Sequence, residues 1–285
     1  MDLPVAPPTS PTSNEIDRGD GLDLNSSGAR FLAVLDDGRI DEACKSLRRM
    51  LGVQTLAKRT FLDVGSGSGL FSLAAMRMGA ARVVSFDHDP HSVACGRELK
   101  RRYFPAADNW TIEQGDVLDD RYLERLGSFD VVYSFGVLHQ TGKLWDALAK
   151  VASCVAPGGR LFIAVYRDQG WMSGLWLQIK QLYNSGAIGR VVVLGAFMPF
   201  VWLLGLFERR KRRSRVHEWI DWLGRLPFEV ASAPAVLAFY KQRHFRLENL
   251  GLSGGHGCNE FVFSRSGTMP PLPLREPPKA PPAPE

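Results

Sequence analysis

The sequence predicts an α/β fold with a doubly wound, mostly parallel sheet of seven strands, an antiparallel last strand and a helical insertion before strand six. Two observations predict this fold. Short apolar runs typical of strands alternate with helical stretches between residues 60 and 165. The alternation stops over residues 171–226, which have a helical pattern, and then resumes to residue 264. Repeated β–α units of this length favour parallel strands with helices on both faces.

The elements follow from the apolar runs and the breaks between them. The expected strands are Thr60–Val64, Arg82–Phe86, Trp110–Gln114, Phe129–Tyr133, Arg160–Val165, Phe245–Leu252 and Cys258–Ser264. The expected helices are Leu70–Met78, His91–Tyr103, Asp119–Leu126, Lys143–Val155 and Ala233–Arg243. We expect a turn at Pro157-Gly158-Gly159 before the fifth strand. The glycine-rich segment Ser253–Gly257 suits a hairpin, so the last strand should return antiparallel.

Composition places these elements in one domain between two tails. Residues 1–25 and 266–285 hold twelve of the 18 prolines, so we expect disordered tails around a domain at 26–265 that includes the insertion. Hydrophobic residues make up 45% and charged residues 23%, an ordinary globular balance. The four cysteines form no C-x-x-C pair, which argues against a zinc site or a disulfide framework. We therefore expect no metal site. The N-terminus has no signal pattern, so we expect a cytoplasmic protein.

A glycine-rich loop follows the first expected strand and opens the first helix of the sheet. The segment Asp63-x-Gly65-x-Gly67-x-Gly69 lets the backbone turn tightly and lets a ligand approach without a Cβ in the way. The helix start supplies free amide groups beside the loop. A dinucleotide-binding fingerprint needs a third glycine three residues after Gly67, where this chain has Leu70. The loop therefore disfavours NAD.

Acidic residues end the next two strands. Asp87 lies 22 residues after Gly65, where a carboxylate can accept hydrogen bonds from both hydroxyls of a ribose. Asp116 ends the third strand and can accept a hydrogen bond from an adenine amino group, while the Val117 amide meets a ring nitrogen. Taken singly, each aspartate could equally be a turn or helix cap. Their placement at successive strand ends, where open α/β sheets bind ligands, favours the binding function.

Five motifs in this order resemble those of class I S-adenosylmethionine-dependent methyltransferases. They are Asp63-x-Gly65-x-Gly67-x-Gly69, Asp87, Gly115-Asp116-Val117, Phe129-Asp130-Val131-Val132 and Pro157-Gly158-Gly159. The stretch Tyr133–His139 looks like the fourth-strand motif of the branch that contains ubiquinone and menaquinone biosynthesis methylases. The resemblance covers Thr60–Val165 and, more weakly, the closing strands. It implies a Rossmann-like methyltransferase fold and S-adenosyl-L-methionine as the cofactor.

The same resemblance assigns cofactor-binding residues. They are Asp63, Gly65, Gly67, Gly69, Asp87, His88, Asp116, Val117 and Ser134. Asp63 and the glycine loop would hold the methionine part, and Asp87 would hold the ribose. His88 would flank the adenine, whose edge Asp116 and Val117 would contact.

Two histidines are the candidate catalytic residues. His139 follows the fourth strand and His256 lies in the hairpin turn, so both are expected on the rim of the sheet that holds the cofactor. Imidazole titrates near neutral pH and can accept a proton from a phenol or alcohol. The alternative, in which both are loop residues without a catalytic role, stays open. Tyr166 and Asn259 are expected to shape the substrate pocket. Gln140 replaces a second histidine found in several members of the branch, which puts base catalysis from this loop in doubt.

The insertion contains an apolar stretch followed by basic residues. Val191–Phe207 has no charged side chain, and six arginines or lysines follow between Arg209 and Arg215. At ~1.5 Å per residue the stretch reaches about 25 Å, short of a hydrocarbon core of about 30 Å. A single crossing would also separate the last two strands from their sheet. We expect either a lid helix over the substrate or peripheral membrane contact through residues 191–215, at the inner face of a membrane.

These features predict methyl transfer to a small, apolar or aromatic acceptor, with O-methylation favoured. A nucleic-acid methyltransferase that modifies amino groups would carry a D/N-P-P-aromatic motif after the fourth strand, where this chain has Tyr133-Ser134-Phe135-Gly136. That class is disfavoured despite the basic run. A membrane-associated protein that binds S-adenosylmethionine without catalysis remains an alternative, and an NAD-dependent oxidoreductase is a third.

Overall fold

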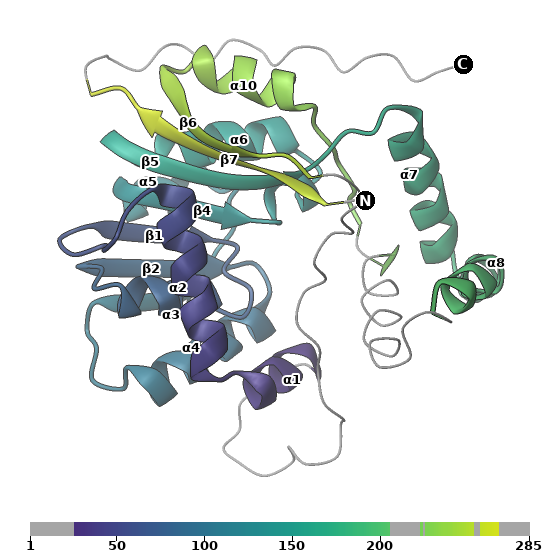
Figure 1. The fold of residues 1–285 in the computed structure, drawn as a ribbon, viewed down its shortest axis with the longest axis horizontal. Helices are drawn as coiled ribbons and strands as arrows, with labels where there is room; N and C mark the ends of the chain where they lie inside the picture. The colour runs from purple at the N-terminus through teal and green to yellow at the C-terminus, as the bar shows by residue number, and fades with distance from the viewer. Residues whose placement is uncertain (1–25, 206–222, 225, 254–256, 268–285) are drawn as a thin grey trace.

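The computed structural model describes residues 26–205, 223–224, 226–253 and 257–267. At its centre lies a seven-stranded sheet with the order β3-β2-β1-β4-β5-β7-β6 (Figure 1). The strands are β1 (Thr60–Val64), β2 (Arg82–Asp87), β3 (Trp110–Gln114), β4 (Phe129–Phe135), β5 (Val155–Tyr166), β6 (Phe245–Gly251) and β7 (Cys258–Arg265). Strands β1 to β5 pair in parallel, whereas β7 is antiparallel to both β5 and β6. The predicted fold class is confirmed.

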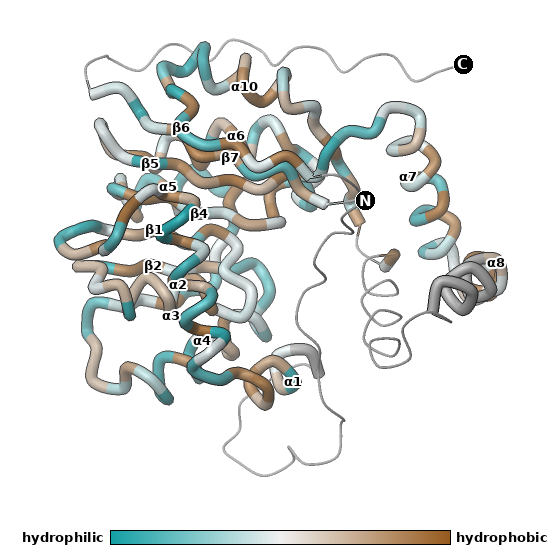
Figure 2. Tube along the Cα trace, viewed as in Figure 1, coloured by the Kyte–Doolittle hydropathy of each residue, from teal (hydrophilic) through white to brown (hydrophobic). Residues whose placement is uncertain are grey.

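Helices cover both faces of this sheet. The described helices, of which α7 and α8 lie beside the sheet, are α1 (Ser26–Val34), α2 (Asp37–Leu51), α3 (Leu70–Arg77), α4 (Pro90–Tyr103), α5 (Asp120–Leu126), the 3₁₀ helix η1 (Leu138–Gln140), α6 (Leu144–Ser153), α7 (Trp171–Asn184), α8 (Ala187–Gly205) and α10 (Ala233–Lys241). Alternate side chains of β1 point to opposite faces. Phe61 packs with α1 to α4, and Leu62 packs with α5, α6 and α10. Two apolar layers therefore hold the sheet, and in Figure 2 hydrophobic residues run along much of its strands.

The segment Pro157-Gly158-Gly159 lies inside β5, which corrects the predicted turn before that strand. Phe129 of β4 pairs with Val155, but Val131 pairs with Arg160, so the register shifts between these pairs. Gly158 has φ +74°. Such a bulge lets β5 begin pairing with β4 before the chain bends, and the strand then continues beside both β4 and β7.

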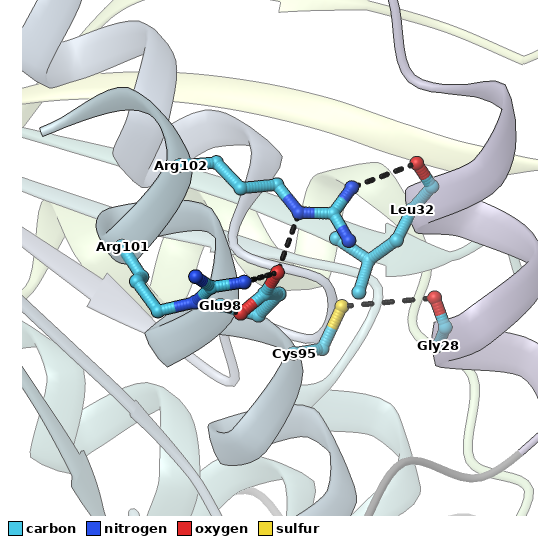
Figure 3. Close-up of polar contacts among 6 residues, drawn as sticks. All are labelled: Gly28, Leu32, Cys95, Glu98, Arg101 and Arg102. Carbon is cyan, nitrogen blue, oxygen red and sulfur yellow. Dashed lines mark hydrogen bonds and ion pairs between the residues drawn. The ribbon is translucent and has the colours of Figure 1, made fainter. Parts of the chain in front are cut away.

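Two helices before residue 60 were not predicted from the sequence. Helix α2 begins after Asp36, whose side chain accepts a hydrogen bond from the Arg39 amide, and ends at Gly52 in the left-handed conformation. Helix α1 packs on α4, as Figure 3 shows. There, Arg102 donates hydrogen bonds to the carboxylate of the buried Glu98 and to the Leu32 carbonyl. This arginine therefore ties the last turn of α1 to α4.

Helices α7 and α8 contact each other and lie to one side of the sheet (Figure 1). The basic run at 209–215 and His256 fall outside the described residues, as do residues 1–25 and 268–285 of the expected tails. Within the described part of the chain, no helix is long and apolar enough to cross a membrane. Several apolar side chains on α7 and at the start of α8 face solvent, including Trp171, Ile188 and Val191.

Candidate functional site

The loop between β1 and α3 is held against the end of β2. The amides of Gly65 and Ser66 both donate to the Phe86 carbonyl, at 2.9 and 3.0 Å. Gly65 and Gly67 have φ of +67° and +52°, a conformation that glycine adopts without steric cost. A Cβ added at Gly67 would meet no atom within 4 Å. The loop therefore exposes bare backbone to an open space.

Asp87, at the end of β2, joins this loop to the start of α4. Its Oδ2 accepts a hydrogen bond from the Gly67 amide at 2.8 Å, and its Oδ1 accepts one from the Asp89 amide at 2.9 Å. A carboxylate oxygen can accept more than one hydrogen bond, so both oxygens keep capacity for a ligand. Burial is the largest effect on the pKa of Asp87 and raises it, against the opposing effect of these two amides.

Asp63 lies under the loop on β1 and is buried. The Ser72 hydroxyl, on α3, donates to its Oδ2 at 2.5 Å. Burial raises the pKa of Asp63 from 3.8 to about 7, although the Ser72 hydrogen bond opposes the rise. The charge of this carboxylate is therefore sensitive to its surroundings near neutral pH.

The end of β3 forms a second acidic edge. Asp116 Oδ1 accepts a hydrogen bond from the Leu118 amide at 2.8 Å, and Val117 is buried beside it. Gly115 allows the Tyr122 ring to approach, because a Cβ at Gly115 would lie 2.5 Å from Tyr122 Cε1. The backbone here can therefore bring Asp116 and Val117 to the same opening as Asp87.

One cavity of about 730 Å³ brings most of the predicted cofactor residues together. Those that line it are Asp63, Gly65, Gly67, Asp87, His88, Asp116 and Val117. A volume of this size suits a small-molecule ligand. The carboxyl ends of β1, β2, β3 and β4 meet at this cavity, which is where open α/β sheets bind ligands.

Two predicted cofactor residues do not line the cavity but support its wall. Gly69 precedes α3, and a Cβ there would lie 3.2 Å from Gly96 Cα, so it allows α3 and α4 to pack closely. Ser134 is buried and donates to the Val64 carbonyl at 3.0 Å. This bond joins β4 to β1 directly before the glycine loop.

The residues predicted for the acceptor side also lie outside the lining of this cavity, as far as the chain is described. His139 is fully buried; its Nδ1 accepts a hydrogen bond from the Tyr166 amide at 3.3 Å, and its ring centroid lies 3.8 Å from that of Tyr166. Asn259 is buried and its Oδ1 accepts a hydrogen bond from the Ser253 amide at 3.1 Å. His139, Tyr166 and Asn259 thus support the rim where β4, β5 and β7 meet.

An aromatic wall, formed by Phe71, Tyr133 and Phe135, lines the cavity and was not predicted from the sequence. The ring centroids of Phe71 and Tyr133 are 4.8 Å apart, and those of Phe71 and Phe135 are 6.0 Å apart. Phe135 is 45% exposed although it is a large apolar side chain. In the sequence, Phe135 is an apolar residue at the end of an apolar strand. That pattern does not distinguish a residue that lines a cavity from a residue of the core.

A family model described as a methyltransferase domain matches residues 62–163. Two curated relatives are the tRNA U34 carboxymethyltransferase of Methylococcus capsulatus, 31% identical over 124 residues, and the ribosomal protein L11 methyltransferase of Pelobacter propionicus, 33% identical over 138 residues. These alignments cover 43% and 48% of this chain. They cover only 37% and 38% of the relatives' own lengths.

Solved structures share the fold at low sequence identity. A putative methyltransferase in complex with the Haloferax volcanii Trm112 activator has a TM-score of 0.52 at 16% identity, covering 86% of this chain and 96% of that one. Magnesium protoporphyrin IX methyltransferase from Synechocystis, with bound SAM, has a TM-score of 0.51 at 13% identity, covering 87% of each chain. The chain therefore contains a segment that matches the methyltransferase domain, and it shares the fold of solved methyltransferases.

Proposed function

We propose that this protein transfers a methyl group from S-adenosylmethionine to a small acceptor with an apolar or aromatic surface, and that oxygen is the favoured acceptor atom. The observation that supports this is the composition of one cavity. Its lining combines the glycine loop, Asp87 and Asp116 with the aromatic side chains of Phe71 and Phe135. A lining that holds both acidic and aromatic side chains fits an adenosyl cofactor next to an apolar acceptor.

The cofactor end has the donors and acceptors that the adenosyl compound needs. Asp87 has unused acceptor capacity for two ribose hydroxyls, since each of its oxygens takes one backbone amide. We assign Asp116, Val117 and His88 to the adenine. We assign Asp63 and the exposed backbone at Gly67 to the methionine part.

When bound, S-adenosylmethionine supplies a methyl group that is already activated by its sulfonium charge. The protein therefore has to orient the acceptor and exclude water, which can provide most of the acceleration. We assign these tasks to the aromatic wall, where Phe71 and Phe135 offer ring faces for a planar acceptor. The side chain of Val137 packs against Gly65 and limits the space between loop and acceptor.

Proton handling is a separate part of the proposal. A phenol or alcohol must lose a proton, and we propose His139 and His256 as the groups that influence this step. His139 is buried, and its Nδ1 accepts a hydrogen bond from the Tyr166 amide. We therefore propose that it acts indirectly, by positioning Tyr166 and the η1 segment beside the acceptor. We propose that Tyr166 and Asn259 shape the acceptor side of the pocket. An acceptor that is already ionised would need none of these groups.

The first experiment is calorimetric titration of the full chain with S-adenosylmethionine, its demethylated product and NAD. We expect binding of the first two and none of NAD. Methyl transfer should then be measured by mass spectrometry on phenolic, prenylated and polyketide acceptors, with sugars and amines for comparison. Activity confined to sugars or amines would refute the apolar acceptor. Binding without turnover on any acceptor would favour the non-catalytic alternative.

A second candidate acceptor class comes from the curated relatives, which are named for tRNA and for a ribosomal protein. The basic residues between Arg209 and Arg215 would favour a nucleic acid. The aromatic wall and the absence of a D/N-P-P-aromatic motif favour the small acceptor. Bulk tRNA and ribosomal proteins therefore belong in the same assay, and transfer to either would replace our acceptor class.

We also propose that α7 and α8 contact a membrane surface peripherally. Trp171, Ile188 and Val191 are 78%, 82% and 71% exposed, which is unusual for such apolar side chains. Basic residues follow α8 in the sequence and would favour anionic lipids. Co-sedimentation should show binding to vesicles that contain phosphatidylglycerol and weaker binding to neutral vesicles. Equal recovery in the supernatant with both would leave these helices as a lid over the acceptor.

A further inference from the structure

A line of buried hydrogen bonds connects β3 to Asp63. Trp110 Nε1 donates to Ser85 Oγ at 2.8 Å, Ser85 Oγ donates to Ser72 Oγ at 2.6 Å, and Ser72 Oγ donates to Asp63 Oδ2 at 2.5 Å. These side chains come from four different elements, β3, β2, α3 and β1. None of them is more than 3% exposed. The line therefore runs through the core behind the cavity.

The direction of this line is fixed by its first member. An indole N–H can only donate, so Ser85 must accept from Trp110 and has one proton left. Ser85 gives that proton to Ser72, which in turn has only its own proton for Asp63. Every hydroxyl therefore points toward the carboxylate, and hydrogen bonds aligned in one direction strengthen one another. An ionised carboxylate is the strongest acceptor for the end of such a line.

We propose that Trp110, Ser85 and Ser72 are positioning residues that hold Asp63 as an oriented, ionised carboxylate for the amino-acid end of the cofactor. The proposal rests on the proposed function, because that function assigns the methionine part to Asp63. Trp110, Ser85 and Ser72 do not line the cavity. They would influence cofactor binding through the charge of Asp63 and not by touching the cofactor.

Among the described residues, no cationic side chain contributes to the pKa of Asp63. Asp87, at the end of β2, adds a second negative charge. Tyr133, on β4, is a buried hydroxyl whose own pKa is raised, first by burial and then by the charges of Asp63 and Glu260. Burial opposes ionisation of Asp63, and the Ser72 hydrogen bond favours it. The Ser72 backbone amide favours ionisation as well. Because the pKa of Asp63 is about 7, loss of the hydroxyl hydrogen bond would shift the balance between its charged and neutral forms at neutral pH.

The first test is the pH dependence of cofactor affinity. Calorimetry with the demethylated product should compare the wild type with Ser72→Ala and Ser85→Ala between about pH 6 and 8.5. Loss of one hydrogen bond that raises the pKa of Asp63 by about one unit should weaken binding about fivefold at pH 7. The deficit should shrink as the pH rises. Ser85→Ala should show a smaller deficit of the same form, and Ser85→Thr, which keeps the hydroxyl, should restore the wild-type profile.

A matched control is Tyr240→Phe. Tyr240 is also buried, and its hydroxyl donates to the Leu148 carbonyl at 3.1 Å, on the other face of the sheet. Removing this hydroxyl deletes a buried hydrogen bond without touching Asp63. We expect Tyr240→Phe to leave the pH profile of binding unchanged. A deficit in Ser72→Ala that is equal at every pH would mean a merely structural role and would overturn the proposal.

A second readout needs no ligand. In the ¹H–¹⁵N spectrum, the Trp110 Nε1–H resonance, assigned with Trp110→Phe, should shift with a midpoint near the pKa of Asp63. It should lose this titration in Ser72→Ala and in Asp63→Asn. A Trp110 chemical shift that does not change from pH 6 to 8.5 in the wild type would overturn the proposal that this line of hydrogen bonds reports the charge of Asp63. If the Trp110 resonance of the wild type titrates but the protein binds neither cofactor nor product, the link between this line of hydrogen bonds and the charge of Asp63 stands and the proposed function fails.

Discussion

Gly65 and Val137 approach so closely that a Cβ added at Gly65 would lie 2.5 Å from Val137 Cγ1. The glycine loop after β1 is therefore pressed against the segment that follows β4, and both line the same cavity. We expect Gly65→Ala to lower the free energy of unfolding by about 1–3 kcal/mol, because φ is +67° and the new methyl group collides with Val137. Urea unfolding measures this cost, and Gly65→Ala combined with Val137→Ala should recover part of it.

Gly67→Ala is the matched comparison for this prediction. A Cβ at Gly67 meets no atom, so only the left-handed backbone costs stability, about 1 kcal/mol. The methyl group would nevertheless enter the space that we assign to the cofactor. Calorimetry should therefore show a larger loss of affinity than of stability. An affinity equal to that of the wild type would place the cofactor elsewhere.

Asp87→Ala should weaken binding of S-adenosylmethionine by about 1–3 kcal/mol, roughly 5- to 150-fold, because ribose hydroxyls would lose their acceptor. The substitution also removes the hydrogen bonds from the Gly67 and Asp89 amides. Asp119→Ala is a useful control, because Asp119 also accepts a backbone hydrogen bond, from Tyr122, but does not line the cavity. It should reduce stability without changing affinity. Unchanged affinity in Asp87→Ala would refute the assignment to ribose.

The stability of the ligand-free protein should fall as the pH rises through 7. The pKa of Asp63 is about 7 in the folded state against 3.8 for the unfolded chain, so the folded state binds the proton more tightly. This contribution is fully present below pH 3.8 and is lost as the pH rises through 7. Between about pH 5.5 and 8.5 the loss should be about 2 kcal/mol.

Asp63→Asn isolates this effect, since the other titrating groups are common to both proteins. Urea unfolding of the two proteins at both pH values should give a difference that changes by about 2 kcal/mol. Parallel pH dependence in the wild type and the variant would show that Asp63 keeps an ordinary pKa.

Phe135→Ala should separate acceptor binding from folding. Because Phe135 is 45% exposed, its loss should change the free energy of unfolding by less than about 1.5 kcal/mol. The KM for an aromatic acceptor should rise about 2- to 13-fold, since an aromatic contact contributes about 0.5–1.5 kcal/mol. Phe162→Ala should instead destabilise the protein by about 3–5 kcal/mol, because that ring is buried. An unchanged KM in Phe135→Ala would remove the aromatic wall from the acceptor site.

The sequence predicted the sheet well and the cavity only in part. Local patterns define β1 and β3 with the bounds that the structure has, because apolar runs and turn residues are local signals. Which side chain of β4 faces the cavity depends instead on strand alternation within the assembled sheet. Tyr133 and Phe135 line the cavity, whereas Ser134 between them points to the Val64 carbonyl. The motif resemblance named Ser134 and missed its two neighbours for this reason.

Contacts between distant segments were equally hidden. Ser72, Ser85 and Trp110 lie on three elements, and no spacing in the sequence indicates that they form a line to Asp63. The bulge in β5 depends on pairing with β4, which holds Val155 in the sheet before the chain bends at Gly158. The predicted turn was placed there because Pro-Gly-Gly is a local turn signal that does not reveal a neighbouring strand.

The position of Phe135 at the open end of β4 has a consequence for how such an enzyme can diversify. The part of the cavity that we assign to the cofactor includes glycines where a side chain would collide or strain the chain, so these positions tolerate little change. Phe135 is a half-exposed side chain, and we expect its replacement to cost little stability. Descendants of this chain could therefore acquire new acceptors by substitutions at Phe135, while the glycine positions stay constant.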